Sequence, residues 1–135
     1  MTLKILIVED DYVSQKVMSG LLKPYGHCEV TANGAEAIQA FKGAIEEEKK
    51  YDLICLDILM PKMGGQEALK EIRAIEEKNG IRGLDRVKVI MTTALGDNVN
   101  VMSAFKGECE AYVVKPIIKD KLLEQLLVLE LIDEK

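Results

Sequence analysis

The sequence contains few cysteines, and their spacing does not fit a disulfide framework or a zinc site. Its 135 residues include Cys28, Cys55 and Cys109, an odd number without C-x-x-C spacing. Such cysteines are typical of reduced, mostly buried thiols in a cytosolic protein. We therefore expect a cytoplasmic protein that folds without a disulfide or a structural metal.

Long apolar runs and an excess of basic residues are also missing. The chain is 48% hydrophobic and 30% charged, and no apolar stretch is long enough for a bilayer, which favours a globular protein over a membrane protein. The formal net charge of -5 argues against nonspecific binding to nucleic acid. The first residues, MTLKILIVEDD, lack the basic region and the cleavage site of a signal peptide. We expect neither a membrane nor a nucleic acid as a partner.

The chain has no internal repeat, low-complexity tract or linker, so we expect one domain over residues 1–135 with nothing attached. A domain of this length buries roughly 68–70% of the surface that its unfolded chain exposes. It can therefore form a substantial core.

Short β-branched runs alternate with longer helical patterns, which indicates βαβ units around a parallel sheet. Strands are predicted at 3–8, 27–31, 53–56, 87–91 and 111–114. Helices are predicted from 13 to a stop at Gly26, from 35 to the charged run 46–50, and at 67–78, 98–106 and 119–132. The segment 79–86 is a longer connection. The expected fold class is α/β, an open three-layer sandwich of a five-stranded parallel sheet with five helices on its two faces.

Polar side chains follow four of these strands. Glu9, Asp10 and Asp11 come after the first strand, and Asp57 comes after the third. Thr92 and Thr93 come after the fourth strand, and Lys115 comes after the fifth. Because the carboxyl ends of parallel strands lie along one edge, these side chains are expected to meet there. Carboxylates about 4 Å apart repel by roughly 4 kcal/mol per pair at an effective dielectric near 20. The edge therefore needs a cation or a proton.

Oxygen ligands without histidine or cysteine suit Mg²⁺. Asp10 and Asp57 would hold the ion, with Glu9 acting mostly through water. A carboxylate can accept a phosphoryl group, so Asp57 is the candidate acceptor. The Lys115 ammonium and the Thr93 hydroxyl would bind the phosphoryl oxygens. The constellation therefore suits phosphoryl transfer to a carboxylate.

The motifs that carry this chemistry resemble the receiver domain of bacterial two-component response regulators. They are Glu9-Asp10, Asp57 in the frame D-x-x-M-P-x-M-x-G, Thr93-Ala94, and Tyr112-x-x-Lys115-Pro116. Each is weak alone, but together, in this order, they are highly specific and span essentially the whole chain. Without an output domain after the last helix, the chain is similar to the stand-alone receivers of the CheY type. The resemblance implies the strand order 2-1-3-4-5.

The resemblance also implies a function. Asp57 would take its phosphoryl group from a phosphohistidine on a partner histidine kinase or phosphotransfer protein, in a reaction that requires Mg²⁺. The implied metal ligands are Asp10, Asp57 and the backbone carbonyl of Leu59, with Glu9 in the outer position. Thr93 and Lys115 would bind phosphoryl oxygens. Such a domain catalyses only its own phosphorylation and dephosphorylation, so we do not expect a conventional enzyme.

In this family a threonine and an aromatic residue form the switch, here Thr93 and Tyr112. The tyrosine turns inward on phosphorylation and remodels the surface that an unknown downstream protein binds. A cis peptide is implied between Lys115 and Pro116. The chain is expected to be a monomer or a weak, phosphorylation-dependent dimer.

The sequence departs from the family's common pattern at two places that matter. Leu59 and Leu95 occupy the positions that flank the phosphoryl group and tune its hydrolysis. Neither side chain can orient an attacking water, so we expect a long-lived phosphoryl group. Gly64-Gly65 and Ile117 also depart from the pattern, but they do not touch the proposed chemistry.

Other interpretations remain open at this point. An aspartate-nucleophile phosphohydrolase would carry D-x-D, but Leu59 stands where its second acid belongs. A flavodoxin-like cofactor carrier needs a phosphate loop after the first strand, where this chain has three acids. A pseudo-receiver would bind partners without phosphorylation. Asp10 or Asp11 could simply cap the first helix, and we expect that Asp11 does so.

Overall fold

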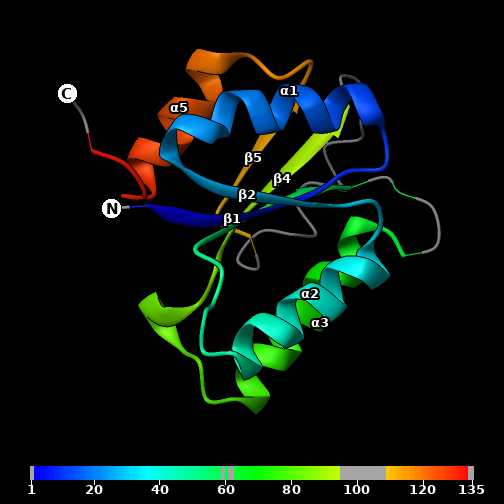
Figure 1. Cartoon of the computed structure of the whole chain (residues 1–135), viewed down its shortest axis with the longest axis vertical. Coiled ribbons are helices and arrows are strands. Elements are labelled where there is room, and N and C mark those ends of the chain that lie inside the picture. The colour runs from blue at the N-terminus through cyan, green and yellow to red at the C-terminus, as the bar shows by residue number, and fades with distance from the viewer. Residues whose placement is uncertain (1, 59, 61–62, 95–108, 134–135) are drawn as a thin grey trace.

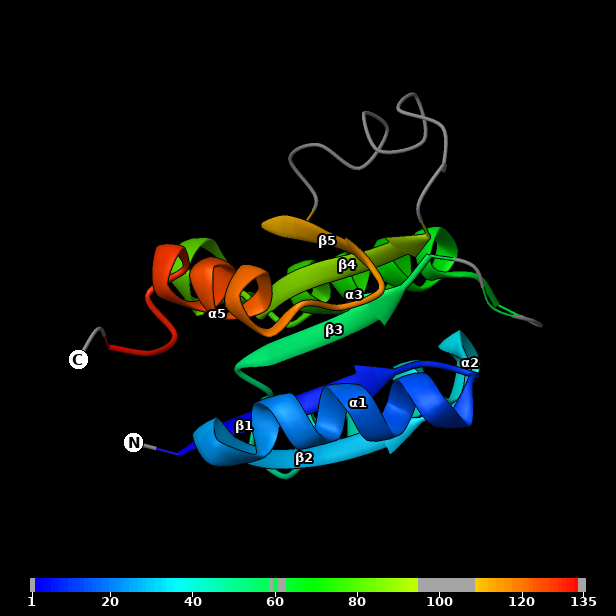
Figure 2. The same cartoon turned by 90° about the horizontal axis from the view of Figure 1, so that it is seen from above.

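The computed structural model describes residues 2–58, 60, 63–94 and 109–133. They form one five-stranded sheet with the order β2-β1-β3-β4-β5 (Figure 2). The strands are β1 (Leu3–Val8), β2 (Gly26–Thr31), β3 (Leu53–Asp57), β4 (Lys88–Ala94) and β5 (Ala111–Lys115). All four neighbouring pairs are parallel, so the predicted sheet and its strand order are confirmed.

Helices cover both faces of the sheet, as expected for a three-layer sandwich. They are α1 (Tyr12–Leu22), α2 (Gly34–Glu46), α3 (Gly65–Lys78) and α5 (Lys119–Val128), with short 3₁₀ turns η1 (Lys23–Tyr25) and η2 (Gly83–Asp85). Figure 1 shows α1 and α5 on one face and α2 and α3 on the other. The helix predicted at 98–106 lies outside the described residues. No helix in the described part of the chain combines the length and apolarity that crossing a membrane would need.

The two faces of the sheet have separate hydrophobic cores because successive strand side chains point in opposite directions. In β1, Leu6 and Val8 belong to the core beneath α2 and α3, whereas Ile5 and Ile7 belong to the core beneath α1 and α5. The inner strand β3 is buried along its whole length. This pattern explains why the inner strands read as continuous apolar runs.

Several predicted boundaries need correction. The last helix ends at Val128, not at residue 132, because Glu130 adopts a left-handed φ of 60° and the N–H of Leu131 turns back to the carbonyl of Leu126. The first helix ends at Leu22 and a 3₁₀ turn continues to Tyr25, so Gly26 does stop the helical segment and is also the first residue of β2. A Cβ at Gly26 would collide with the carbonyl group of Leu3, so the close pairing of β1 and β2 requires glycine.

The fourth strand is longer than predicted, and the second and third helices begin slightly earlier. Thr92 and Thr93 lie inside β4 and do not follow it. Helices α2 and α3 begin at Gly34 and Gly65. The capping role expected of Asp11 is confirmed, because its carboxylate accepts the backbone N–H of Ser14 at 2.9 Å.

A partly buried ion-pair network joins α3 to the beginnings of β4 and β5. Arg73 donates to Glu76 at 2.7 Å, to Glu110 at 3.0 Å and to the carbonyl oxygen of Val87 at 2.9 Å. The two glutamates in turn accept the backbone N–H groups of Val87 and Val89, both at 2.7 Å. The guanidinium of Arg73 therefore holds two strands at the edge where the sheet begins.

Candidate functional site

Three charged side chains reach the same face at the opposite edge of the sheet because each continues the alternation of its strand. Glu9, Asp57 and Lys115 each come two residues after a core side chain on the α1 and α5 face, namely Ile7, Cys55 and Val113 respectively. A period of two keeps them on that face, and the parallel sheet brings the ends of the strands together. The fold thus places a lysine among carboxylates.

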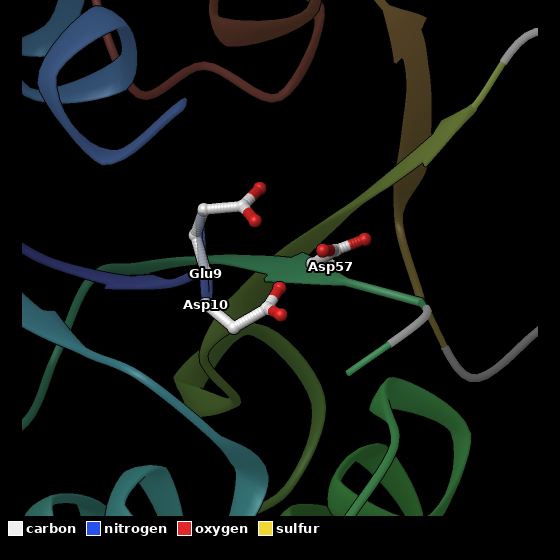
Figure 3. A group of neighbouring side chains, drawn as sticks. All are labelled: Glu9, Asp10 and Asp57. Atoms are coloured by element: carbon white, nitrogen blue, oxygen red, sulfur yellow. The ribbon is translucent and has the colours of Figure 1, made fainter. Parts of the chain in front are cut away.

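Three acids converge on one small space at the ends of β1 and β3 (Figure 3). Carboxylate oxygens of Glu9, Asp10 and Asp57 lie within 4.8 Å of one another. Glu9 and Asp57 are 3% and 6% exposed, whereas Asp10 is exposed to solvent. Oxygen atoms at this separation can share one divalent cation, which is the arrangement expected from the sequence.

Lys115 is the cation that the structure places in this cluster. Its Nζ lies 2.6 Å from Oε1 of Glu9 and 3.3 Å from Oδ2 of Asp57. Burial alone would lower the pKa of Lys115, but the hydrogen bond to Glu9 and the charges of both acids raise it above its usual value. The sequence predicts that this lysine pairs with an acid, and the structure shows that the nearer acid is Glu9.

The carboxyl group of Asp57 lies in an unfavourable place for a negative charge. Burial is the largest cause and the nearby charge of Glu9 adds to it, so the pKa rises from 3.8 to about 6 even though Lys115 lowers it. One ammonium group does not balance the acids gathered here. A further cation would restore the balance, which supports the expectation of a metal site.

The turn between β1 and α1 is held by a chain of hydrogen bonds. The N–H of Glu9 donates to the carbonyl of Thr31 at 3.0 Å, and the N–H of Asp11 donates to Oε2 of Glu9 at 3.1 Å. The side-chain amide of Gln15 donates to the main-chain carbonyl of Glu9 at 2.6 Å. The sequence analysis did not single out Gln15, because an amide one turn into a helix gives no local signal of this contact.

The turn after β3 explains the glycine that ends the D-x-x-M-P-x-M-x-G frame. The N–H of Gly65 donates to the carbonyl of Ile58 at 2.9 Å, and a Cβ at Gly65 would collide with the carbonyl oxygen of Asp57. The start of α3 therefore packs directly against the residue proposed as the acceptor. Leu59, whose carbonyl was predicted to bind the metal, lies outside the described residues.

The other predicted residues that the structure describes belong to β4 and β5 or follow directly after β5. Thr93 is buried near the end of β4, where it pairs with Val114 of β5. Tyr112, the predicted switch partner, is 53% exposed. The peptide between Lys115 and Pro116 is cis, as the resemblance implies. Leu95 lies outside the described residues.

Comparisons with known proteins identify relatives across almost the whole chain. The family described as "Response regulator receiver domain" matches residues 5–127. The chemotaxis protein CheY of Listeria monocytogenes is 35% identical over 127 residues, which cover 92% of this chain and 95% of that protein.

Solved structures agree with this relationship. The receiver domain of the sensor histidine kinase PA1611 from Pseudomonas aeruginosa, which has a magnesium ion coordinated in its active-site cleft, matches with a TM-score of 0.74 and 25% identity over 96% of this chain and 99% of its own. Another match is a chain from the co-crystal structure of the Saccharomyces cerevisiae histidine phosphotransfer protein Ypd1 with the receiver domain of Ssk1. The TM-score is 0.76 and the identity 29%, and the match covers 92% of this chain and 86% of that chain. This chain belongs to the response regulator receiver domain family.

Proposed function

We propose that this chain is a phosphorylation-dependent signalling switch in which Asp57 accepts a phosphoryl group from the phosphohistidine of a histidine kinase or phosphotransfer protein. The observation that carries the proposal is the cluster of Glu9, Asp10 and Asp57 with the Lys115 ammonium between two of them. The co-crystal of a related receiver with a phosphotransfer protein supports this kind of partner.

The residues present fit a magnesium ion. All three acids offer oxygen, and the Asp10 carboxylate is exposed, with no side-chain or backbone partner among the described residues. Asp10 and Asp57 would hold the ion, with Glu9 acting through water and the carbonyl of Leu59 completing the set. Mg²⁺ bound there would neutralise the charge that develops on the phosphoryl oxygens.

The chain's own groups account for the rest of the transfer. An oxygen of Asp57 forms the new O–P bond while the P–N bond of the donor breaks, and the electron pair stays on the imidazole nitrogen. Because the Lys115 ammonium lies 3.3 Å from Asp57, it can follow the phosphoryl oxygens as they arrive. The hydroxyl of Thr93 donates a second hydrogen bond to those oxygens. The chain catalyses only its own phosphorylation and dephosphorylation.

The phosphoryl group acts by changing what the surface binds. Thr93 moves toward the phosphoryl oxygens, and Tyr112, which is exposed in this structure, turns inward. The downstream partner is a protein that distinguishes the two states. We place the switch in the cytoplasm, acting as a monomer or a weak dimer, in keeping with its free cysteines.

Incubation with Mg²⁺ and acetyl phosphate, followed by intact mass measurement, tests the proposal. The wild type should gain one phosphoryl group, and it should gain none when EDTA is present. Asp57→Asn should gain none, whereas Asp52→Asn, directly before β3, should behave as the wild type. A wild type that stays unmodified with Mg²⁺, or an Asp57→Asn variant that gains the same mass, would show that the proposal is wrong.

A further inference from the structure

Asp10 differs from the other two acids of the site in having no support for its side chain. Glu9 and Asp57 are buried and both contact Lys115. The carboxylate of Asp10 is exposed and receives no hydrogen bond from any residue that the structure describes. Its direction therefore depends on the main chain that carries it.

That main chain is held from α1. The carbonyl of Glu9 belongs to the peptide group whose nitrogen is that of Asp10, and Nε2 of Gln15 donates to its oxygen at 2.6 Å. Gln15 is itself fixed in the first turn of α1, because its N–H donates to the carbonyl of Asp11 at 2.9 Å. The amide thus limits rotation of the peptide from which the Asp10 side chain leaves.

We propose that Gln15 is a positioning residue for the metal site, which keeps the Asp10 carboxylate directed toward Asp57 by holding the Glu9–Asp10 peptide. This inference rests on the proposed Mg²⁺-dependent function. Groups that orient metal ligands without touching the metal raise metal affinity, because the ligand loses less freedom on binding. An exposed carboxylate gains most from such support, since no packing restricts it.

A purely structural role for Gln15 predicts a different pattern, and the chain offers a matched control. Nδ2 of Asn79 donates to the carbonyl of Ile75 at 2.8 Å, which is also an amide-to-backbone hydrogen bond. Asn79 caps the end of α3, and it is the opposite end of this helix, at Gly65, that packs against Asp57. Removing either amide deletes one side-chain-to-backbone hydrogen bond, but of the two only Gln15 contacts the peptide of a predicted metal ligand.

The experiment compares Gln15→Met, Gln15→Arg and Asn79→Leu with the wild type. Methionine keeps the length and helix propensity of glutamine but has no donor, whereas arginine keeps a donor at similar reach. Magnesium affinity is measured by calorimetric titration with MgCl₂ at high ionic strength, which screens the added charge of arginine. Urea unfolding without metal measures the stability of each variant. ¹⁵N relaxation of the amides of residues 9–11 measures the motion of the main chain at Asp10.

Gln15→Met should bind Mg²⁺ about threefold to tenfold more weakly and show faster motion at Asp10. Asn79→Leu should bind Mg²⁺ like the wild type whatever stability it loses, and Gln15→Arg should recover affinity. Unchanged affinity in Gln15→Met, an equal loss in Asn79→Leu or no recovery in Gln15→Arg would overturn the positioning role and leave the proposed function standing. A wild type that binds no Mg²⁺ would overturn both.

Discussion

Asp57→Asn should stabilise the metal-free protein at neutral pH and should not do so in acid. The substitution keeps the size of the side chain but removes its negative charge. In the folded protein, burial and the neighbouring Glu9 raise the pKa of Asp57 from 3.8 to about 6. A group whose pKa rises on folding contributes stability that is complete below its unfolded pKa and is lost as the pH rises through the folded value.

The magnitude follows from the size of the shift. About two pKa units at 1.36 kcal/mol each give about 3 kcal/mol as an upper bound. The site opens to solvent on the side of Asp10, which screens the charge, so we expect an observed difference of about 1–2 kcal/mol. Asparagine does not titrate, so Asp57→Asn does not lose stability as the pH rises. The two proteins should therefore differ above pH 7 and agree within a few tenths of a kcal/mol below pH 4.

Urea unfolding in EDTA across the range between these limits measures the effect. Asp85→Asn, in the exposed turn η2, changes the net charge equally and should show no comparable pH-dependent gain. Saturating Mg²⁺ at neutral pH should make the wild type more stable than Asp57→Asn, because only the wild type keeps the full set of metal ligands. A Mg²⁺ concentration 100 times the Kd adds about 2.7 kcal/mol to the free energy of unfolding. Equal stability of Asp57→Asn and wild type above pH 7, or a gain that persists below pH 4, would refute the reasoning.

Three further substitutions test other parts of the molecule. Lys115→Met removes a cation whose gross attraction to Asp57 at 3.3 Å is about 5 kcal/mol at a dielectric of 20. Mg²⁺ should therefore bind more tightly in calorimetry, while phosphorylation by acetyl phosphate slows at least about tenfold. A parallel loss of both would contradict this charge-based explanation. Leu59→Asn should shorten the life of the phosphoryl group, measured by timed phosphate release, and an unchanged lifetime would count against a role for the apolar side chain of Leu59. Arg73→Met removes the hydrogen bonds to Glu76 and Glu110, although Arg86 stays 3.7 Å from Glu76, and should cost about 1.5–3 kcal/mol in urea unfolding. A loss below about 0.5 kcal/mol would show that the network is dispensable.

The sheet and most of the site could be predicted because their signals are local. Short β-branched runs identified the strands, and the acids and the lysine come at or directly after the ends of the apolar ones. Alternation within each strand then places Glu9, Asp57 and Lys115 on one face without any knowledge of side-chain conformation. The strand order came from the family resemblance, because apolar periodicity does not reveal which strands are neighbours.

The parts that could not be predicted depend on distances between separate elements. The preference of Lys115 for Glu9 over Asp57 is a difference of 0.7 Å between contacts of 2.6 and 3.3 Å, which only the packed strands determine. The contact of Gln15 depends on how α1 leaves the end of β1. The last helix was predicted too long because its leucines continue in helical spacing past residue 128, whereas the backbone reverses at Glu130.

The hydrogen bond between Lys115 and Glu9 joins residues 106 positions apart, and the lysine belongs to the last strand of the sheet. The ammonium group beside Glu9 and Asp57 is therefore in place only after this strand has been synthesised and has paired with β4. A chain still emerging from the ribosome, or one whose final strand has detached, carries the same aspartate but lacks its positive neighbour. Under the proposed function, only molecules with all five strands in place would accept the phosphoryl group.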